Sequence, residues 1–174
     1  MNELSVTVLV LVNVAAWFII HMGFAWGGTM LPRRVFRPEC RVFRLRAFER
    51  NGALYERLFR IKAWKGLLPD GAKLFKQGFP KARLVQADAD YLQQFIRETC
   101  RGEAVHWAVF LASGLFFLWN PPAVAVWMVA YGIVSNLPCI LAQRYNRIRM
   151  QRLVRKQLGR RVEGTPSEAV GGSQ

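Results

Sequence analysis

Residues 108–142, AVFLASGLFFLWNPPAVAVWMVAYGIVSNLPCILA, contain no Lys, Arg, Asp or Glu, and an Asn-Pro-Pro tripeptide at 120–122 divides them. A run of about 20 apolar residues is long enough to cross a hydrocarbon core about 30 Å thick. Proline disfavours helix in the residue before it and is common in turns. The stretch therefore predicts two membrane helices joined by a turn, a shorter span at 103–119 and another at 122–142.

A further uncharged stretch lies at residues 4–26, LSVTVLVLVNVAAWFIIHMGFAW. Its apolar length exceeds the roughly 7–15 residues of a signal-peptide core, no Lys or Arg precedes it, and no convincing cleavage site of small residues follows it. We therefore predict an uncleaved anchor. The expected fold class is an all-α integral membrane protein with about three transmembrane helices.

Positive charge is distributed unevenly around these spans. All 25 Lys and Arg residues lie after position 32, in the segment between the first two spans or in the tail after the third. Because Lys and Arg are enriched in cytoplasmic loops, residues 27–102 and the basic tail from residue 143 are predicted to be cytoplasmic, and the N-terminus to be outside. We therefore expect a multi-pass protein of the cell membrane with a cytoplasmic C-terminus.

The net charge of +14 is also a feature of nucleic-acid-binding proteins. Here the basic groups flank membrane spans, where attraction to anionic lipid headgroups explains them, so no nucleic-acid partner is expected. The three cysteines show no CxxC spacing, and the two histidines lie in separate spans without further ligands nearby. We expect no disulfide framework, no metal and no cofactor.

The predicted cytoplasmic segment interleaves aromatic and basic side chains at residues 41–65, RVFRLRAFERNGALYERLFRIKAWK. An apolar stripe there would contain Phe48, Tyr55, Leu58, Phe59 and Ile61. This pattern is typical of an amphipathic helix on a membrane surface. Periodicity alone does not distinguish such a helix from one that packs on its own domain.

The remaining parts of the chain complete a single membrane domain over residues 1–161. Pro-Asp-Gly at 69–71 is a strong turn signal. A helix is predicted to begin at Asp88 or Asp90 and to run into the second span. Residues 162–174 are predicted to be a disordered tail.

The stretch ETCRGEAVHW, residues 98–107, places two carboxylates, an arginine and a histidine where the second span begins. On a helix, Glu103 and His106 are three residues apart and share a face, and Glu98 and Arg101, also three apart, form an arginine–glutamate pair one turn further out. A carboxylate beside a histidine fixes its tautomer and strengthens it as a base, which is how hydroxyls are activated for acyl transfer. The alternative is a charged helix end, with Trp107 in an interfacial aromatic belt.

The third span carries polar side chains on one face. Asn136, Gln143 and either Asn146 or Arg147 recur at helical spacing. Polar groups in a membrane helix face a polar cavity, or they form hydrogen bonds between helices. The same two interpretations apply to His21, which lies inside the predicted cytoplasmic end of the first span.

These segments together resemble the glycosyl-4,4'-diaponeurosporenoate acyltransferase family of carotenoid biosynthesis. The resemblance rests on WKGLLPDG at 64–71, ETCRGEAVHW at 98–107 and NLPCILAQRYNRIR at 136–149, and it covers the chain from about residue 17 to 156. Its specific parts are the ETxRxExxHW and QRYNR patterns. It implies acylation of a sugar hydroxyl on a membrane-embedded, glucosylated C30 carotenoid, the last step towards staphyloxanthin-like pigments.

The candidate catalytic residues are His106, as the base that deprotonates the hydroxyl, and Glu103, which would orient the imidazole. The residues predicted to bind substrate or to support these two are Glu98, Arg101, Trp107, Asn136, Gln143, Arg144, Tyr145, Asn146, Arg147, Asp70 and His21.

Among the supporting residues, Asn136 or Gln143 is expected to donate a hydrogen bond to the oxyanion. Arg144 and Arg147 are expected to hold phosphates of the acyl carrier or of a lipid headgroup. The expected donor is acyl-CoA or acyl carrier protein, and the expected acceptor is a glycosylated carotenoid or another lipid. Without a GxSxG motif, direct transfer is favoured over an acyl-enzyme.

Two other functions fit the same sequence. One is a membrane protein without catalytic activity that binds anionic lipids or a pathway partner. The other is an acyltransferase with a different lipid acceptor.

Overall fold

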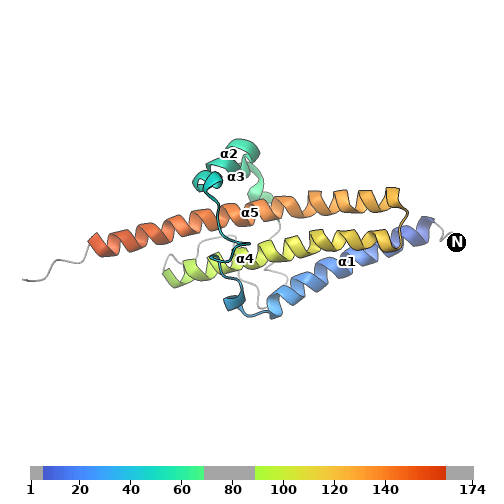
Figure 1. Cartoon of the computed structure of the whole chain (residues 1–174), viewed down its shortest axis with the longest axis horizontal. Coiled ribbons are helices and arrows are strands. Elements are labelled where there is room, and N and C mark those ends of the chain that lie inside the picture. Colours follow the sequence, from blue (N-terminus) through green and yellow to red (C-terminus); the bar gives the residue numbers. More distant parts are fainter. Residues whose placement is uncertain (1–5, 69–88, 164–174) are drawn as a thin grey trace, which may run out of the picture.

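The computed structural model describes residues 6–68 and 89–163, and every regular element within these ranges is a helix. Three long helices lie side by side (Figure 1): α1 (Val6–Met30), α4 (Ala89–Ala112) and α5 (Pro122–Glu163). α4 is the central helix, since it packs against both α1 and α5. The predicted all-α class is confirmed.

α4 and α5 are joined by the turn predicted at Asn-Pro-Pro. The chain passes from α4 into the 3-10 helix η5 (Ser113–Leu118) and begins α5 at Pro122. Proline is favoured at the first helical position, because its fixed φ suits the helix and its missing N–H has no intrahelical acceptor there. Asn120 closes the turn by donating from Nδ2 to the Phe116 carbonyl oxygen at 2.9 Å.

α1 runs antiparallel to α4 and makes close contacts near both of its own ends, with the turn after η5 at one end and with α4 at the other. At one end Asn13 and Asn120 exchange two amide hydrogen bonds of 2.9 Å, and Trp119 Nε1 donates a third to Asn13 at the same distance. At the other end Gly28 lies so close to α4 that an added Cβ atom would be 2.5 Å from Val105 Cγ2. Small residues allow helices to approach in this way in a membrane.

α1 buries a polar and a small residue and exposes large apolar side chains, which is the reverse of a helix in the core of a soluble protein. Its buried residues are Asn13 and Gly28, whereas Phe18 and Ile19 are each 68% exposed. α1 and the first 38 residues of α5 are long and apolar enough to cross a membrane. Large exposed apolar surfaces of this kind mark membrane contact, so the protein is membrane-associated.

The second predicted span, 103–119, consists of two pieces. Its first part is the C-terminal half of α4, and its second part is the tighter helix η5. It is therefore not one long apolar α-helix like the other two.

The segment between α1 and α4 forms several short helices instead of one long amphipathic helix. They are η1 (Arg33–Val35), η2 (Ala47–Gly52), α2 (Ala53–Phe59), α3 (Ile61–Trp64) and η3 (Lys65–Leu67). Gly52 and Arg60 adopt left-handed φ angles of 91° and 46° and interrupt the helical run.

This interruption divides the predicted apolar stripe between two environments. Tyr55 and Ile61 are buried in one cluster with Tyr145 and Ile148 of α5. Phe48, Leu58 and Phe59 remain exposed. Part of the stripe thus packs on the protein, and the rest forms an apolar outer surface beside basic side chains.

α5 continues through the predicted basic tail as one helix to Glu163. Beyond residue 143 it packs against the first half of α4, where its Met150 and Val154 join an apolar cluster of Leu92, Phe95 and Ile96. The helix pair therefore extends past the apolar spans. The predicted turn at 69–71, which includes Asp70, and residues 164–174 of the predicted disordered tail lie outside the described residues.

The close approach of α1 and α4 predicts that Gly28→Ala destabilises the protein, because the new Cβ atom displaces Val105 or separates the helices. We expect a loss of about 1–3 kcal/mol, the usual effect of overpacking. Gly23→Ala in the same helix is the matched control, because nothing lies within 4 Å of its Cβ position. Thermal unfolding of both variants in detergent tests this, and equal melting temperatures would contradict the packing.

Candidate active site

The ETCRGEAVHW motif lies on α4 and turns a polar face towards α5. Thr99, Cys100 and Glu103 are fully buried there, as is Glu98 on the adjoining face. Charged side chains are rarely so deeply buried unless they are paired. The partners of these carboxylates therefore organise this end of the bundle.

Glu103 binds two arginines of α5. Its Oε1 accepts a hydrogen bond of 2.8 Å from Arg144 Nη1, and its Oε2 accepts one from Arg147 Nη2. Arg147 is fully buried, donates from Nη1 to Cys100 Sγ at 3.4 Å, and lies over the ring of Phe43. The arginines predicted to hold phosphates are thus paired with a protein carboxylate.

Arg144 also connects α5 to the segment between α1 and α4. Its Nε and Nη2 donate to the two carboxylate oxygens of Glu49, each at 3.1 Å, which is the bidentate geometry that suits a guanidinium. Glu49 accepts two further hydrogen bonds, from Tyr55 Oη at 2.5 Å and from the backbone N–H of Arg46. Glu49 and Glu103 therefore hold Arg144 between them.

The protonation states of Glu49 and Tyr55 follow from these contacts. Burial raises the pKa of the Glu49 carboxyl, but hydrogen bonds from Arg144, Tyr55 and the Arg46 backbone outweigh it, and the pKa lies below its ordinary value. Burial and the Glu49 carboxylate raise the pKa of Tyr55 to about 12. Near neutral pH Glu49 is therefore a carboxylate and Tyr55 a neutral donor.

His106 lies one helical turn after Glu103 and faces Asn136 of α5. The distance between His106 Nδ1 and Asn136 Oδ1 is 2.9 Å. Asn136 Nδ2 donates to the Gly132 carbonyl oxygen and to Ser135 Oγ, both at 3.0 Å, which directs its oxygen to the imidazole. An amide oxygen only accepts, so Nδ1 carries the proton, and in a neutral imidazole the lone pair is then on Nε2.

The predicted contact between Glu103 and His106 is not the one that the structure shows. Both side chains belong to the same face of α4, but Glu103 turns to the guanidinium groups of Arg144 and Arg147, and the acceptor at His106 Nδ1 is Asn136. Two buried cations attract a carboxylate more strongly than a neutral imidazole does. The structure therefore separates an ionic cluster from a histidine–amide pair.

The predicted arginine–glutamate pair one turn before Glu103 is confirmed. Glu98 Oε2 lies 2.5 Å from Arg101 Nη2 at a spacing of three residues. Its other oxygen lies 3.0 Å from Nε of Arg33 in η1. This cluster attaches the chain that leaves α1 to the middle of α4.

The other predicted site residues occupy several environments. Asn146 accepts a hydrogen bond of 3.0 Å from Lys65 Nζ, and Tyr145 is buried beside Tyr55 with the Lys65 ammonium over its ring. Gln143 is half-buried on α5. Trp107 is 38% exposed and contacts Phe110 edge-on.

His21 lies deeper along the bundle than His106. Its Nδ1 donates to the Trp17 carbonyl oxygen at 3.0 Å within α1. Trp17 in turn stacks on Phe116 of η5 and meets Tyr131 of α5 edge-on. This histidine therefore belongs to an aromatic contact between the three helices.

The sequence prediction missed Glu49 and Tyr55, which complete the ionic cluster. One signal was available: Glu49 is the single acidic residue between positions 40 and 55, a strongly basic stretch. An isolated carboxylate among arginines often marks a specific ion pair. The tyrosine gave no separate signal, because its aromatic ring also fitted the apolar stripe.

Two cysteines lie on the helices that form the site. Cys100 is fully buried and therefore not an accessible nucleophile, whereas Cys139 is half-buried and donates weakly to the Ser135 carbonyl oxygen. In the described parts of the chain, no group of three or more His, Cys, Asp or Glu side chains is placed to hold a metal ion.

Comparison with known families places these features in context. A family model described as glycosyl-4,4'-diaponeurosporenoate acyltransferase matches residues 32–156. The chain belongs to this family. Its predicted class, an acyltransferase, is confirmed by that membership. The match contains Glu49, Glu103, His106, Asn136 and Arg144, whereas His21 lies outside it.

Individual relatives agree with the family assignment. The glycosyl-4,4'-diaponeurosporenoate acyltransferase of Staphylococcus aureus strain MRSA252 is 32% identical over 139 residues, which cover 80% of this chain and 84% of the relative. The proteins of the same name from strains bovine RF122 / ET3-1 and USA300 are each 31% identical with the same coverage. No solved structure shows a significant match to the chain.

The buried ionic cluster predicts a large effect of Glu103→Gln on stability. The substitution leaves Arg147 buried without its carboxylate, and breaking a buried pair on one side typically costs about 3–5 kcal/mol. Glu39→Gln is the control, because it makes the same chemical change at an exposed position. We expect a strongly lowered melting temperature in detergent only for Glu103→Gln, and similar curves for the two variants would disprove the structural role.

Proposed function

We propose that the protein transfers a fatty acyl group from a thioester donor to a sugar hydroxyl of a glycosylated carotenoid, or of a related glycolipid, held in the membrane. The family name supports the acceptor class. The observation that carries the proposal is the hydrogen bond between His106 Nδ1 and Asn136 Oδ1. It fixes the imidazole in the tautomer that a general base requires.

In the proposed reaction, His106 Nε2 takes the proton of the acceptor hydroxyl while its oxygen forms a bond to the thioester carbonyl carbon. The carbon–sulfur bond then breaks and the new ester is released. The departing thiolate takes the proton back from His106, which returns to its neutral form. Asn136 holds the ring in both states, because Nδ1 carries a proton throughout.

A developing oxyanion requires a donor near the carbonyl oxygen. Asn136 was one of two predicted donors, but its Nδ2 already donates to Gly132 and Ser135. Gln143 on α5 is the other predicted donor, and removing one such donor typically costs about 3–4 kcal/mol of transition-state stabilisation.

We further propose that three segments cross the membrane: α1, residues 103–118 and the first half of α5. The middle span is short, but its last six residues form the 3-10 helix η5. Ten α-helical residues at about 1.5 Å and six 3-10 residues at about 2.0 Å together extend about 27 Å, close to the hydrocarbon thickness. The 3-10 conformation thus lengthens a span that would otherwise be too short.

The distribution of charge supports an orientation with the N-terminus outside and α5 ending in the cytoplasm. His106 then lies at the cytoplasmic end of the second span. A soluble thioester donor reaches this level from the aqueous side, and a glycolipid reaches it from within the bilayer. The proposed site is therefore at the depth where both substrates are accessible.

The proposed role of His106 predicts that His106→Ala removes acylated product. A positioned general base typically contributes about 10²–10⁴-fold to the rate, so a loss of that size is expected. Lipid profiling by mass spectrometry of cells that express the native protein or the variant at equal levels measures it and identifies the acceptor. Undiminished product at equal protein level would show that His106 is not the catalytic base.

The proposed role of Asn136, which holds the His106 ring, predicts a change in pH dependence when its side chain is altered. Asn136→Asp places a carboxylate at Nδ1, which stabilises the imidazolium, so that the neutral base is reached only at higher pH. We expect activity to persist, with the acid limb of the pH–rate profile displaced upward by about 1–3 pH units. Asn136→Ala should lower the rate without this displacement. An unchanged profile for Asn136→Asp would show that Asn136 does not position His106.

A further inference from the structure

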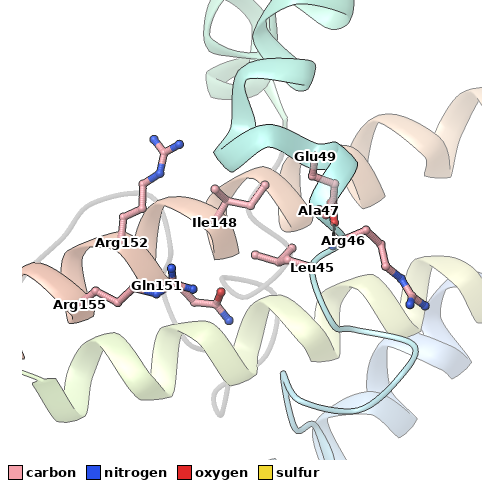
Figure 2. A pocket seen from close by; sticks show the side chains of 8 residues that line it. All are labelled: Leu45, Arg46, Ala47, Glu49, Ile148, Gln151, Arg152 and Arg155. Atoms are coloured by element: carbon pink, nitrogen blue, oxygen red, sulfur yellow. Dashed lines mark hydrogen bonds between the residues drawn. The ribbon is translucent and has the colours of Figure 1, made fainter.

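A cavity of about 170 Å³ lies beside α5 (Figure 2), and its lining does not include His106 or Asn136. One wall comes from the segment around η2 and the other from α5. The lining residues are Leu45, Arg46, Ala47, Glu49, Ile148, Gln151, Arg152 and Arg155. We call this cavity the arginine cleft.

The arginine cleft is positively charged. Three of its lining residues are arginines and one is a glutamate, and that carboxylate, Glu49, already accepts a bidentate pair of hydrogen bonds from Arg144. The Arg46 side chain extends away from the other two arginines (Figure 2) and donates from Nη2 to the Arg41 carbonyl oxygen at 2.9 Å, whereas no ion pair within residues 6–68 and 89–163 involves Arg155. Arginine forks match phosphate oxygens in both charge and geometry, so a phosphate is the group that suits this cleft best.

The position of the cleft along α5 distinguishes the possible sources of that phosphate. The predicted span ends at residue 142, and Ile148 and Arg155 lie about 9 Å and about 20 Å further along the helix at 1.5 Å per residue. The lipid headgroup layer on each side of a bilayer is only about 5–8 Å thick. The cleft therefore lies in the water beyond the headgroups, where a soluble ligand binds.

The distance from the cleft to the proposed reaction centre matches one class of ligand. Ile148 lies about 18 Å along α5 from Asn136, the partner of His106. A phosphopantetheine arm has about a dozen bonds between phosphorus and sulfur. At the peptide value of about 3.3–3.6 Å for three backbone bonds, it extends about 15 Å. A phosphate at the Ile148 end of the cleft would thus place the thioester near His106.

We propose that the arginine cleft binds the phosphate of a phosphopantetheine thioester and so positions the acyl donor. This inference rests on the proposed function and assigns the donor site to Arg152 and Arg155. It also replaces Arg144 and Arg147, which are neutralised by Glu49 and Glu103, as the phosphate ligands. Coenzyme A and acyl carrier protein share this phosphate, so the cleft accepts either source.

The test uses the full chain in nanodiscs of phosphatidylcholine and the double variant Arg152→Gln/Arg155→Gln. Initial rates are measured with palmitoyl-CoA, with palmitoyl acyl carrier protein and with S-palmitoyl pantetheine, which lacks phosphate. In the native protein, the preference for a phosphate-bearing donor is the ratio of its kcat/KM to that of the phosphate-free donor. We expect this ratio to fall about 10–100-fold in the double variant, because KM for the phosphate-bearing donors rises. Loss with only one of the two carriers identifies the natural donor.

Lys156→Gln is the matched control, because it removes one exposed positive charge from the same part of α5 without lining the cleft. It should leave the preference unchanged. Arg152→Lys/Arg155→Lys should restore part of it. The inference is overturned if the glutamine variant keeps the native preference, or if its kcat/KM falls equally with all three donors. It is also overturned if the variant binds phosphatidylglycerol nanodiscs more weakly than the native protein while its donor kinetics are unchanged, because the ligand would then be a lipid headgroup.

Equilibrium binding of coenzyme A and pantetheine, without turnover, separates this inference from the proposed function. If the native protein binds coenzyme A through the two arginines but transfers no acyl group from any thioester, the phosphate site stands and the proposed reaction is refuted. If the native protein transfers acyl groups and its donor preference does not change in the variants, the proposed reaction stands and the phosphate site is refuted.

Discussion

The buried carboxylate of Glu103 and its two arginines are the interaction on which the rest of the site depends. Each of these groups would be strongly destabilising if it lost its partner in a medium of low polarity. The register of α4 against α5 is therefore fixed where Glu103 meets Arg144 and Arg147. Arg144 extends the same requirement to Glu49 in the segment between α1 and α4. His106 and Asn136 are brought together because they lie further along two helices whose register is already set.

The two ends of the bundle use different kinds of polar contact. At the turn between η5 and α5, neutral amides of Asn13 and Asn120 pair with each other and with Trp119. At the opposite end the contacts are ionic and involve four separate segments. Neither partner of an amide pair carries a formal charge. Both partners of an ion pair do, so that solvent or further hydrogen bonds are needed to offset their desolvation. Charge therefore gathers where the bundle approaches water, and that is also where thioester chemistry is proposed.

The sequence predicted the long helices and the turn between α4 and α5, because each depends on local composition: uncharged apolar runs, an Asn-Pro-Pro break and helical spacing. It also predicted the pair of Glu98 and Arg101, which lie on one helix. It did not predict that Glu103 binds α5 or that Asn136 binds His106, because contacts between helices depend on register, which composition does not specify. The left-handed conformation of Arg60, which interrupts the predicted amphipathic helix, likewise has no local signal.

α5 is one unbroken helix from the turn at Pro122 to Glu163, and it carries both Asn136 and the arginines of the cleft. Insertion of a single residue between these positions would rotate everything beyond it by about 100° and move it by about 1.5 Å. Such a change would turn Arg144, Arg147 and Arg152 away from all their present neighbours at once. Homologous chains are thus expected to preserve the length of this stretch as strictly as its polar side chains, so that an alignment gap there would indicate a protein with different chemistry.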